Sequence, residues 1–64
     1  MKAPTPIVIR KARVHADLNY AQAAAPLYYG YRAWMQWEAG TRTMHPALWE
    51  LWNLKVLGKG RGGK

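Results

Sequence analysis

Two side chains able to hydrogen-bond to DNA bases lie close together in residues 31–40. Arg32 and Gln36 are one helical turn apart, and Gly40 supplies the left-handed conformation that commonly ends a helix. An arginine can donate two parallel hydrogen bonds to guanine and a glutamine can pair with adenine; each good contact discriminates between bases by about 1–3 kcal/mol. The simpler interpretation is that both residues are solvated on an outer helix face. The residue types alone leave both interpretations open.

Other kinds of chemistry have little support in the sequence. The chain has no cysteine, and His15 and His45 are isolated, so we expect no metal site and no cofactor. It contains no nucleophile–base pair, no paired carboxylates and no glycine-rich phosphate loop after a strand. We therefore predict that the protein is not an enzyme and has no small-molecule substrate.

The bulk composition favours one small basic domain. At 64 residues the chain is near the lower limit for burying a stable core alone, but four Trp and four Tyr give it high burial capacity. A net charge of +7 favours a polyanionic partner, with nucleic acid first and an anionic membrane surface or acidic protein second. No apolar run approaches the roughly 20 residues that span a bilayer. A cytosolic setting is the default expectation.

The first helix is predicted over residues 6–16, after a loose arm at residues 1–4. Thr5 can cap the helix, and Pro6 is well tolerated as its first residue. The β-branched run at residues 7–9 is a competing strand signal. The expected inner face consists of Ile9, Ala12, Arg13 and Ala16.

The second helix is predicted to begin at Tyr20, with Asn19 as its N-cap. Pro26 removes a helical hydrogen bond, so this helix should be short or bent near its end. A tight link then leads to Gly30, the expected N-cap of the third helix. Within that helix, Trp34 and Trp37 share one face; stacking on unpaired bases is the alternative to core packing, and their helical spacing favours the core.

The last helix is predicted to run from Pro46 to about residue 57, and apolar residues nearly encircle it. We expect Leu48 and Leu51 in the core and a partner surface on another side. Trp49 and Trp52 should divide between core and interface, in an order that the sequence leaves open. The residues assigned to a dimer interface are Trp49, Trp52 and Val56. A flexible basic tail is expected over residues 58–64.

Residues 18–24 (LNYAQAA), followed by residues 32–40 (RAWMQWEAG), carry a family resemblance. Together with residues 41–51 they resemble the Cro/C1 (XRE-type) helix-turn-helix regulators, and the likeness covers residues 10–55. The resemblance implies an all-α fold of four short helices, lambda-repressor-like and without a fifth helix, formed by residues 5–57. Departures from the family are Pro26 and Tyr28, the latter at a position where a turn glycine is usual.

The resemblance also assigns roles to individual residues. It implies base contacts by Tyr31, Arg32 and Gln36, and an ion pair between Arg13 and Glu38. Ala24 matches the small residue between the two motif helices, and Trp34 and Trp37 match inward positions. The DNA backbone contacts expected are Tyr20, Thr41, Arg42, Thr43, Lys59 and Arg61.

The function that the resemblance implies is a sequence-specific repressor of double-stranded DNA. We expect a homodimer on an inverted-repeat operator, autoregulation, and a phage or mobile-element origin in the cytoplasm of a bacterial host. Anti-CRISPR-associated and antitoxin-like regulators are both subfamilies of this kind. Two alternatives stay open. One is a basic inhibitor that binds a host protein through its aromatic last helix, and the other is a small RNA-binding protein.

Overall fold

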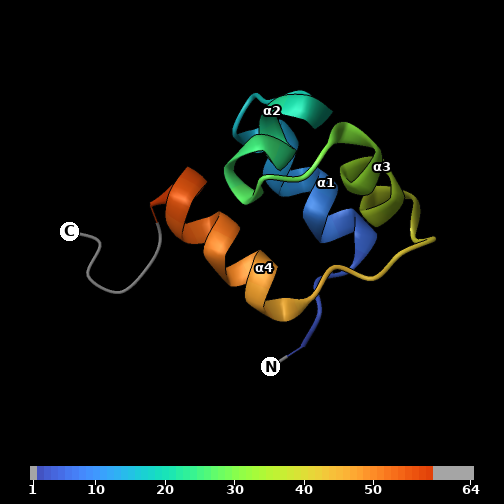
Figure 1. Cartoon of the computed structure of the whole chain (residues 1–64). Coiled ribbons are helices and arrows are strands. Elements are labelled where there is room, and N and C mark those ends of the chain that lie inside the picture. Colours follow the sequence, from blue (N-terminus) through green and yellow to red (C-terminus); the bar gives the residue numbers. More distant parts are fainter. Residues whose placement is uncertain (1, 59–64) are drawn as a thin grey trace.

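Helices form all the regular structure in residues 2–58, the part of the chain that this computed structural model describes (Figure 1). The prediction of an all-α fold with four short helices is confirmed for this part. The elements in chain order are α1 (Pro6–His15), α2 (Tyr20–Ala24), the 3₁₀ turn η1 (Ala25–Leu27), α3 (Tyr31–Ala39), α4 (Pro46–Trp52) and the π-helical turn η2 (Asn53–Leu57).

Side-chain caps fix where three of the helices begin. The Thr5 hydroxyl accepts from the Val8 N–H at 3.3 Å, which places the β-branched run 7–9 in α1 and overrides its strand signal. Asn19 and Gln22 form a reciprocal capping box at the start of α2, with bonds of 2.8 and 3.0 Å. At α4 the Nδ1 atom of His45 accepts from the backbone N–H two residues later.

Pro26 shortens the second helix, as the sequence predicts. α2 ends at Ala24, and the chain tightens into η1, which accommodates the proline near its beginning. Tyr28 then takes a left-handed conformation with φ of 61°, so a tyrosine occupies a position that favours glycine. Gly30 follows as the N-cap of α3, and Gly40 ends that helix with φ of 84°. The link and both ends of α3 therefore lie where expected.

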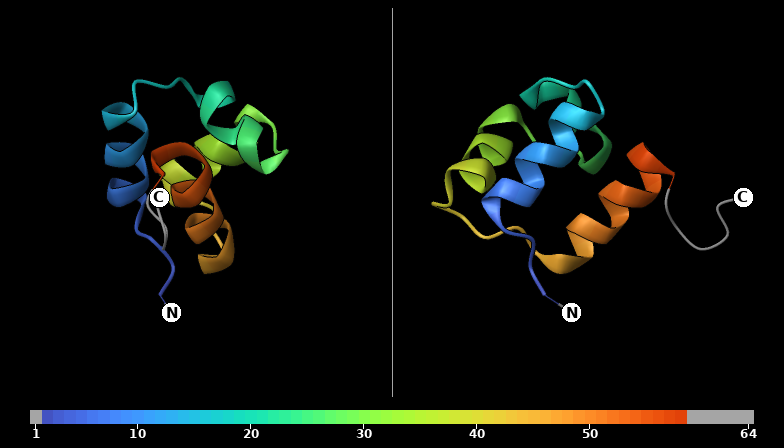
Figure 2. Two further views of the ribbon diagram at one scale, coloured as in Figure 1. Left: turned by 90° about the vertical axis from the view of Figure 1, so that its left-hand side faces the viewer. Right: turned by 180° about the vertical axis from the view of Figure 1, so that it is seen from behind.

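Tryptophan rings form the centre of the core. α3 packs against α1 and α2, and α4 packs against η1 (Figure 2). The rings of Trp37, Trp34, Trp52 and Trp49 follow one another in space, with neighbouring centroids 5.3–5.6 Å apart. Tyr29 extends this row at the Trp37 end. The buried residues are Ile9, Ala23, Ala24, Leu27, Ala33, Trp34, Trp37, Met44 and Trp52.

The orientation of the last helix corrects two predictions. Trp52 is fully buried, so its assignment to a dimer interface is wrong. Its indole N–H donates to the Ala23 carbonyl at 2.8 Å, which satisfies a buried acceptor and fixes the rotation of α4 about its axis. Leu51, predicted to be core, consequently faces away and is 39% exposed. Its neighbour Leu48 is half-buried and packs against the core.

Trp52 is thus the core member of the predicted Trp49–Trp52 division. Trp49 and Val56 are half-buried and pack against the core, and their assignment to an interface stays a prediction. Met44, in the loop before α4, is fully buried, although its polar and basic neighbours in sequence gave no sign of it. The loop from α3 to α4 is therefore anchored in the core.

Candidate nucleic-acid interface

The outer face of α3 brings together the side chains predicted to contact bases. Ala33, Trp34 and Trp37 are buried, and this orientation turns the remaining positions outward. The residues that line a shallow hollow of about 300 Å³ on the outer face are Tyr31, Arg32, Met35 and Gln36. All four are exposed, Tyr31 by 50% and Met35 by 42%.

Met35 is the member of this group that the sequence analysis assigned no role. Its spacing could have revealed it, because it lies one turn after Tyr31 and beside Gln36 on the same face. It adds an apolar surface between polar side chains. The hollow thus combines two apolar side chains, Tyr31 and Met35, with a cation and an amide.

A largely buried ion pair fixes α3 against α1. Arg13 Nε donates to Glu38 Oε2 at 2.5 Å and Arg13 Nη2 to Glu38 Oε1 at 3.3 Å, a bidentate arrangement. The side chains are only 16% and 7% exposed. The third guanidinium nitrogen, Nη1, donates to the Leu18 carbonyl at 2.9 Å, so Arg13 also holds the link that precedes α2. The predicted Arg13–Glu38 pair is therefore formed.

Glu38 is also bound by the aromatic core. The Trp34 indole N–H donates to Glu38 Oε2 at 2.6 Å. The side-chain hydrogen bond with Glu38 raises the pKa of Arg13, although burial opposes the increase. Arg13 therefore remains charged, and the Trp34 bond, which lies within α3, orients the carboxylate that Arg13 binds from α1.

The chain leaving α3 is tied back to Gln36. Its carbonyl accepts from the backbone N–H groups of Gly40, Thr41 and Arg42 at 3.0, 3.2 and 3.3 Å. Arg42 Nη1 also lies 3.5 Å from the Gln36 side-chain oxygen. Thr41, Arg42 and Thr43 are all exposed just beyond the C-terminus of α3. The structure places these predicted backbone-contacting residues next to the outer face of α3.

The other predicted backbone contacts divide into two groups. Tyr20 is 37% exposed at the start of α2, and its ring lies beneath the Arg13 guanidinium, 4.6 Å from its centroid. Tyr20 therefore has a structural contact whether or not it reaches a phosphate. Lys59 and Arg61, in the predicted tail, lie outside the described residues.

Residues 2–58 contain neither a cluster of metal-ligand side chains nor a membrane-spanning helix. No group of three His, Asp or Glu side chains comes close enough to hold a metal ion there. Over the same residues, every helix is too short or too polar to cross a membrane. The outer face of α3 is thus the candidate site that the sequence and the geometry both indicate.

The sequence matches no protein-family model, and no curated protein matches it.

Proposed function

We propose that the protein is a sequence-specific repressor of the Cro/C1 (XRE-type) kind that binds double-stranded DNA through α3. The observation that carries this proposal is the outward display of Tyr31, Arg32, Met35 and Gln36 on one rigid helix. In the major groove, Arg32 would donate to guanine O6 and N7, and Gln36 would pair with adenine. Met35 and Tyr31 offer apolar contact to a thymine methyl group.

Rigidity supports the proposal because direct readout requires side chains held in register with base edges. The Arg13–Glu38 pair, the Trp34 indole and the left-handed Gly40 cap hold α3 along its length. A helix fixed in this way loses little conformational entropy on binding. Arg42, beside the same face, and the overall charge of +7 supply sequence-independent attraction to phosphates.

The proposed repressor acts as a homodimer, and we assign its interface to residues other than Trp52, because that side chain is buried. Leu51 and Leu54 are 39% and 44% exposed on the last helical segment, and they form the apolar surface that we assign to a second copy. Two α3 helices about 34 Å apart would then enter successive major grooves of an inverted repeat. Repression is steric: the dimer covers promoters, among them the promoter of the protein's own gene. The setting is the cytoplasm of a bacterial host that carries the phage or mobile element.

The experiment is footprinting on the DNA upstream of the gene, with wild type, Arg32→Ala and Arg10→Ala compared. Arg32→Ala should weaken specific binding about tenfold or more, since it removes a bidentate base contact, and should keep weak non-specific binding. Arg10→Ala removes the same charge from an exposed site on α1 and serves as the matched control. Wild-type operator affinity in Arg32→Ala would rule out direct readout by α3.

The same experiment separates the alternatives. A small RNA-binding protein would prefer RNA to duplex DNA of equal length at physiological salt. An inhibitor of a host protein would be indifferent to Arg32→Ala and would show no footprint. A footprint of two half-sites about one helical turn apart supports the dimer, and Leu51→Gln with Leu54→Gln should reduce it to weak single-site binding.

A further inference from the structure

The outer face of α1 exposes apolar side chains directly opposite its buried face. Ile7 and Val14 are 64% and 57% exposed, whereas Ile9, between them in sequence, is buried. The two exposed residues lie two helical turns apart, about 10 Å along the axis, and point to the same side. α1 is therefore apolar on two opposite faces, of which the fold uses one.

Folding does not explain the choice of these residues. β-branched side chains are less favourable than Ala, Leu or Lys at exposed helix positions, because they lose rotamer freedom. At their present exposure Ile7 and Val14 gain little burial in return. Residues that weaken a helix and add little to the core suggest a surface used for binding.

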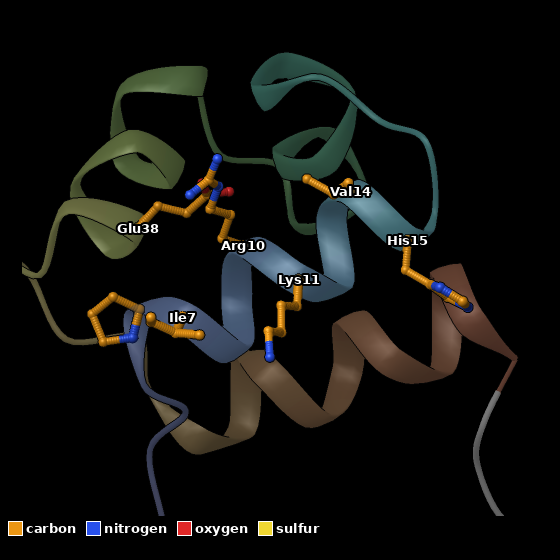
Figure 3. A pocket seen from close by; sticks show the side chains of 7 residues that line it. Ile7, Arg10, Lys11, Val14, His15 and Glu38 are labelled. Carbon is orange, nitrogen blue, oxygen red and sulfur yellow. The ribbon is translucent and has the colours of Figure 1, made fainter.

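These residues line a shallow hollow of about 750 Å³ along α1 (Figure 3). In Figure 3, Arg10 extends on the α3 side of the helix and Lys11 on the opposite side, so the apolar surface has a cation on each flank. Besides Pro6, the residues that line the hollow are Ile7, Arg10, Lys11, Val14, His15 and Glu38.

The hollow is positively charged despite the presence of Glu38. That carboxylate already accepts from Arg13 and from the Trp34 indole, so its charge is neutralised from the other side. Neither Arg10 nor Lys11 forms an ion pair with any residue between 2 and 58. An apolar strip with unpaired cations on both flanks is complementary to an amphipathic segment that carries acids.

A second copy of the chain is a poor occupant. Each copy carries a net charge of +7, and its acids are limited to Asp17, Glu38 and Glu50. Glu38 is bound to Arg13. Two copies brought together at this basic hollow would therefore repel each other more than they attract.

We propose that the α1 hollow docks an acidic amphipathic helix of a partner protein. Apolar side chains of the partner, about two turns apart, would pack on Ile7 and Val14, while its Asp and Glu side chains would pair with Arg10 and Lys11. The α1 hollow and the outer face of α3 are lined by different residues. The proposal therefore stands apart from DNA binding, and the two can fail separately.

The test is titration of the ¹⁵N-labelled full chain with a synthetic acidic helix of about 18 residues, long enough to be helical when stapled. The probe carries leucines at i, i+3, i+4 and i+7 and glutamates on both flanks; its control has the same composition in scrambled order. We expect chemical-shift changes confined to α1 and its immediate neighbours, and binding about tenfold weaker or worse for the scrambled peptide.

Variants then decide the outcome. Ile7→Gln with Val14→Gln should weaken binding of the probe about tenfold, whereas Val8→Gln, an exposed α1 residue outside the hollow, should not. The substituted positions are exposed, so both variants should fold. A circular dichroism spectrum like that of wild type is the folding control. Three results would overturn the proposal. They are equal binding of the scrambled peptide, no binding of the acidic helix, and no effect of the double substitution.

Two other polyanions complete the test. Vesicles of phosphatidylserine and phosphatidylcholine, and a duplex DNA of arbitrary sequence, are titrated against the same variants. If either binds in a manner that depends on Ile7 and Val14 while the peptide does not, the hollow serves that ligand and the protein-docking proposal is wrong. If Arg32→Ala weakens binding of the upstream DNA about tenfold or more but leaves peptide binding unchanged, the two surfaces are independent, as proposed.

Discussion

Two junctions hold this molecule together by different physics. The charged junction joins α1 to α3 through Arg13 and Glu38, whose bonds are short, directional and nearly closed to water. The aromatic junction joins α4 to α2 and α3 through Trp52, whose ring packs on Trp34 and Trp49. Its directional contact is the hydrogen bond from the indole N–H to the Ala23 carbonyl.

In this small chain one junction supplies most of the stabilising free energy, and the other fixes the relative orientation of two helices. Ring burial gives the aromatic junction its free energy, since each large aromatic side chain removes much apolar surface from water. A bidentate ion pair contributes less net free energy, because desolvation offsets attraction, but it allows one relative placement of the two helices. Trp34 belongs to both junctions, because its ring packs on Trp52 and its N–H reaches Glu38.

Trp34→Ala should have the largest effect, since it damages both junctions. Truncating a buried aromatic residue costs about 3–5 kcal/mol, comparable to the whole stability that a core of this size supplies. We expect an unfolded chain at 25 °C, measured by far-ultraviolet circular dichroism. Trp34→Phe is the control, because it keeps an aromatic ring in the core while it loses the N–H donor and the five-membered ring; it should destabilise less than Trp34→Ala. A cooperative melt near the wild-type temperature for Trp34→Ala would show that the junctions do not meet at this residue.

Arg13→Ala and Glu38→Ala should each destabilise by about 3–5 kcal/mol, because either one leaves an unpaired buried charge. The double substitution should cost less than the sum. Urea denaturation in a stabilising osmolyte measures all three, even if a single variant is unfolded in buffer alone. The coupling should change little with salt, since buried pairs are weakly screened. Additive costs would mean that the pair does not orient α3.

Trp52→Phe should destabilise by about 1–3 kcal/mol, because the Ala23 carbonyl loses its only donor from α4 while most of the ring burial remains. Trp49→Phe is the matched control: that indole is half-buried and its N–H donates to no residue between 2 and 58. Thermal denaturation compares the two. A larger loss of thermal stability for Trp49→Phe than for Trp52→Phe would indicate that ring stacking, and not the N–H bond, orients α4.

Lys55→Ala should have the smallest effect. Lys55 Nζ lies 5.0 Å from the Tyr28 ring centroid and donates to the Pro26 carbonyl at 3.0 Å, an exposed counterpart of Arg13 above Tyr20. Exposed contacts of this kind contribute about 0.5–1 kcal/mol. The loss should shrink further in 1 M salt, as followed by urea denaturation. A loss of stability as large as that of Arg13→Ala would mean that the exposed cation contact contributes as much as the buried one.

Residues that act locally made most of the fold predictable. Thr5, Asn19, Gly30, Gly40 and Pro46 each determine a helix end through their own backbone or capping chemistry, which needs no knowledge of distant contacts. The inward tryptophans of α3 followed from helical spacing for the same reason. The Arg13–Glu38 pair was predictable only through the family resemblance, since the two residues are 25 positions apart.

Contacts between distant segments account for the errors. Apolar residues surround α4, so its periodicity could not say which side faces the core; the Trp52 bond to Ala23, 29 positions away, decides it and leaves Leu51 outside. Met44 was missed because a loop residue has no periodicity to read. In the candidate site, the family resemblance predicted Arg32 and Gln36, whereas Met35 was assigned no role although helical spacing places it on the same outer face.

The row of rings from Trp37 to Trp49 has an optical consequence. Neighbouring indoles with centroids 5.3–5.6 Å apart exchange excitation energy readily, so the four should fluoresce as one coupled group. All four belong to the core or pack against it, and none lies on the outer face of α3. The emission spectrum should therefore follow unfolding closely and barely respond to a ligand on that face, giving the protein a built-in signal for folding that binding leaves largely unchanged.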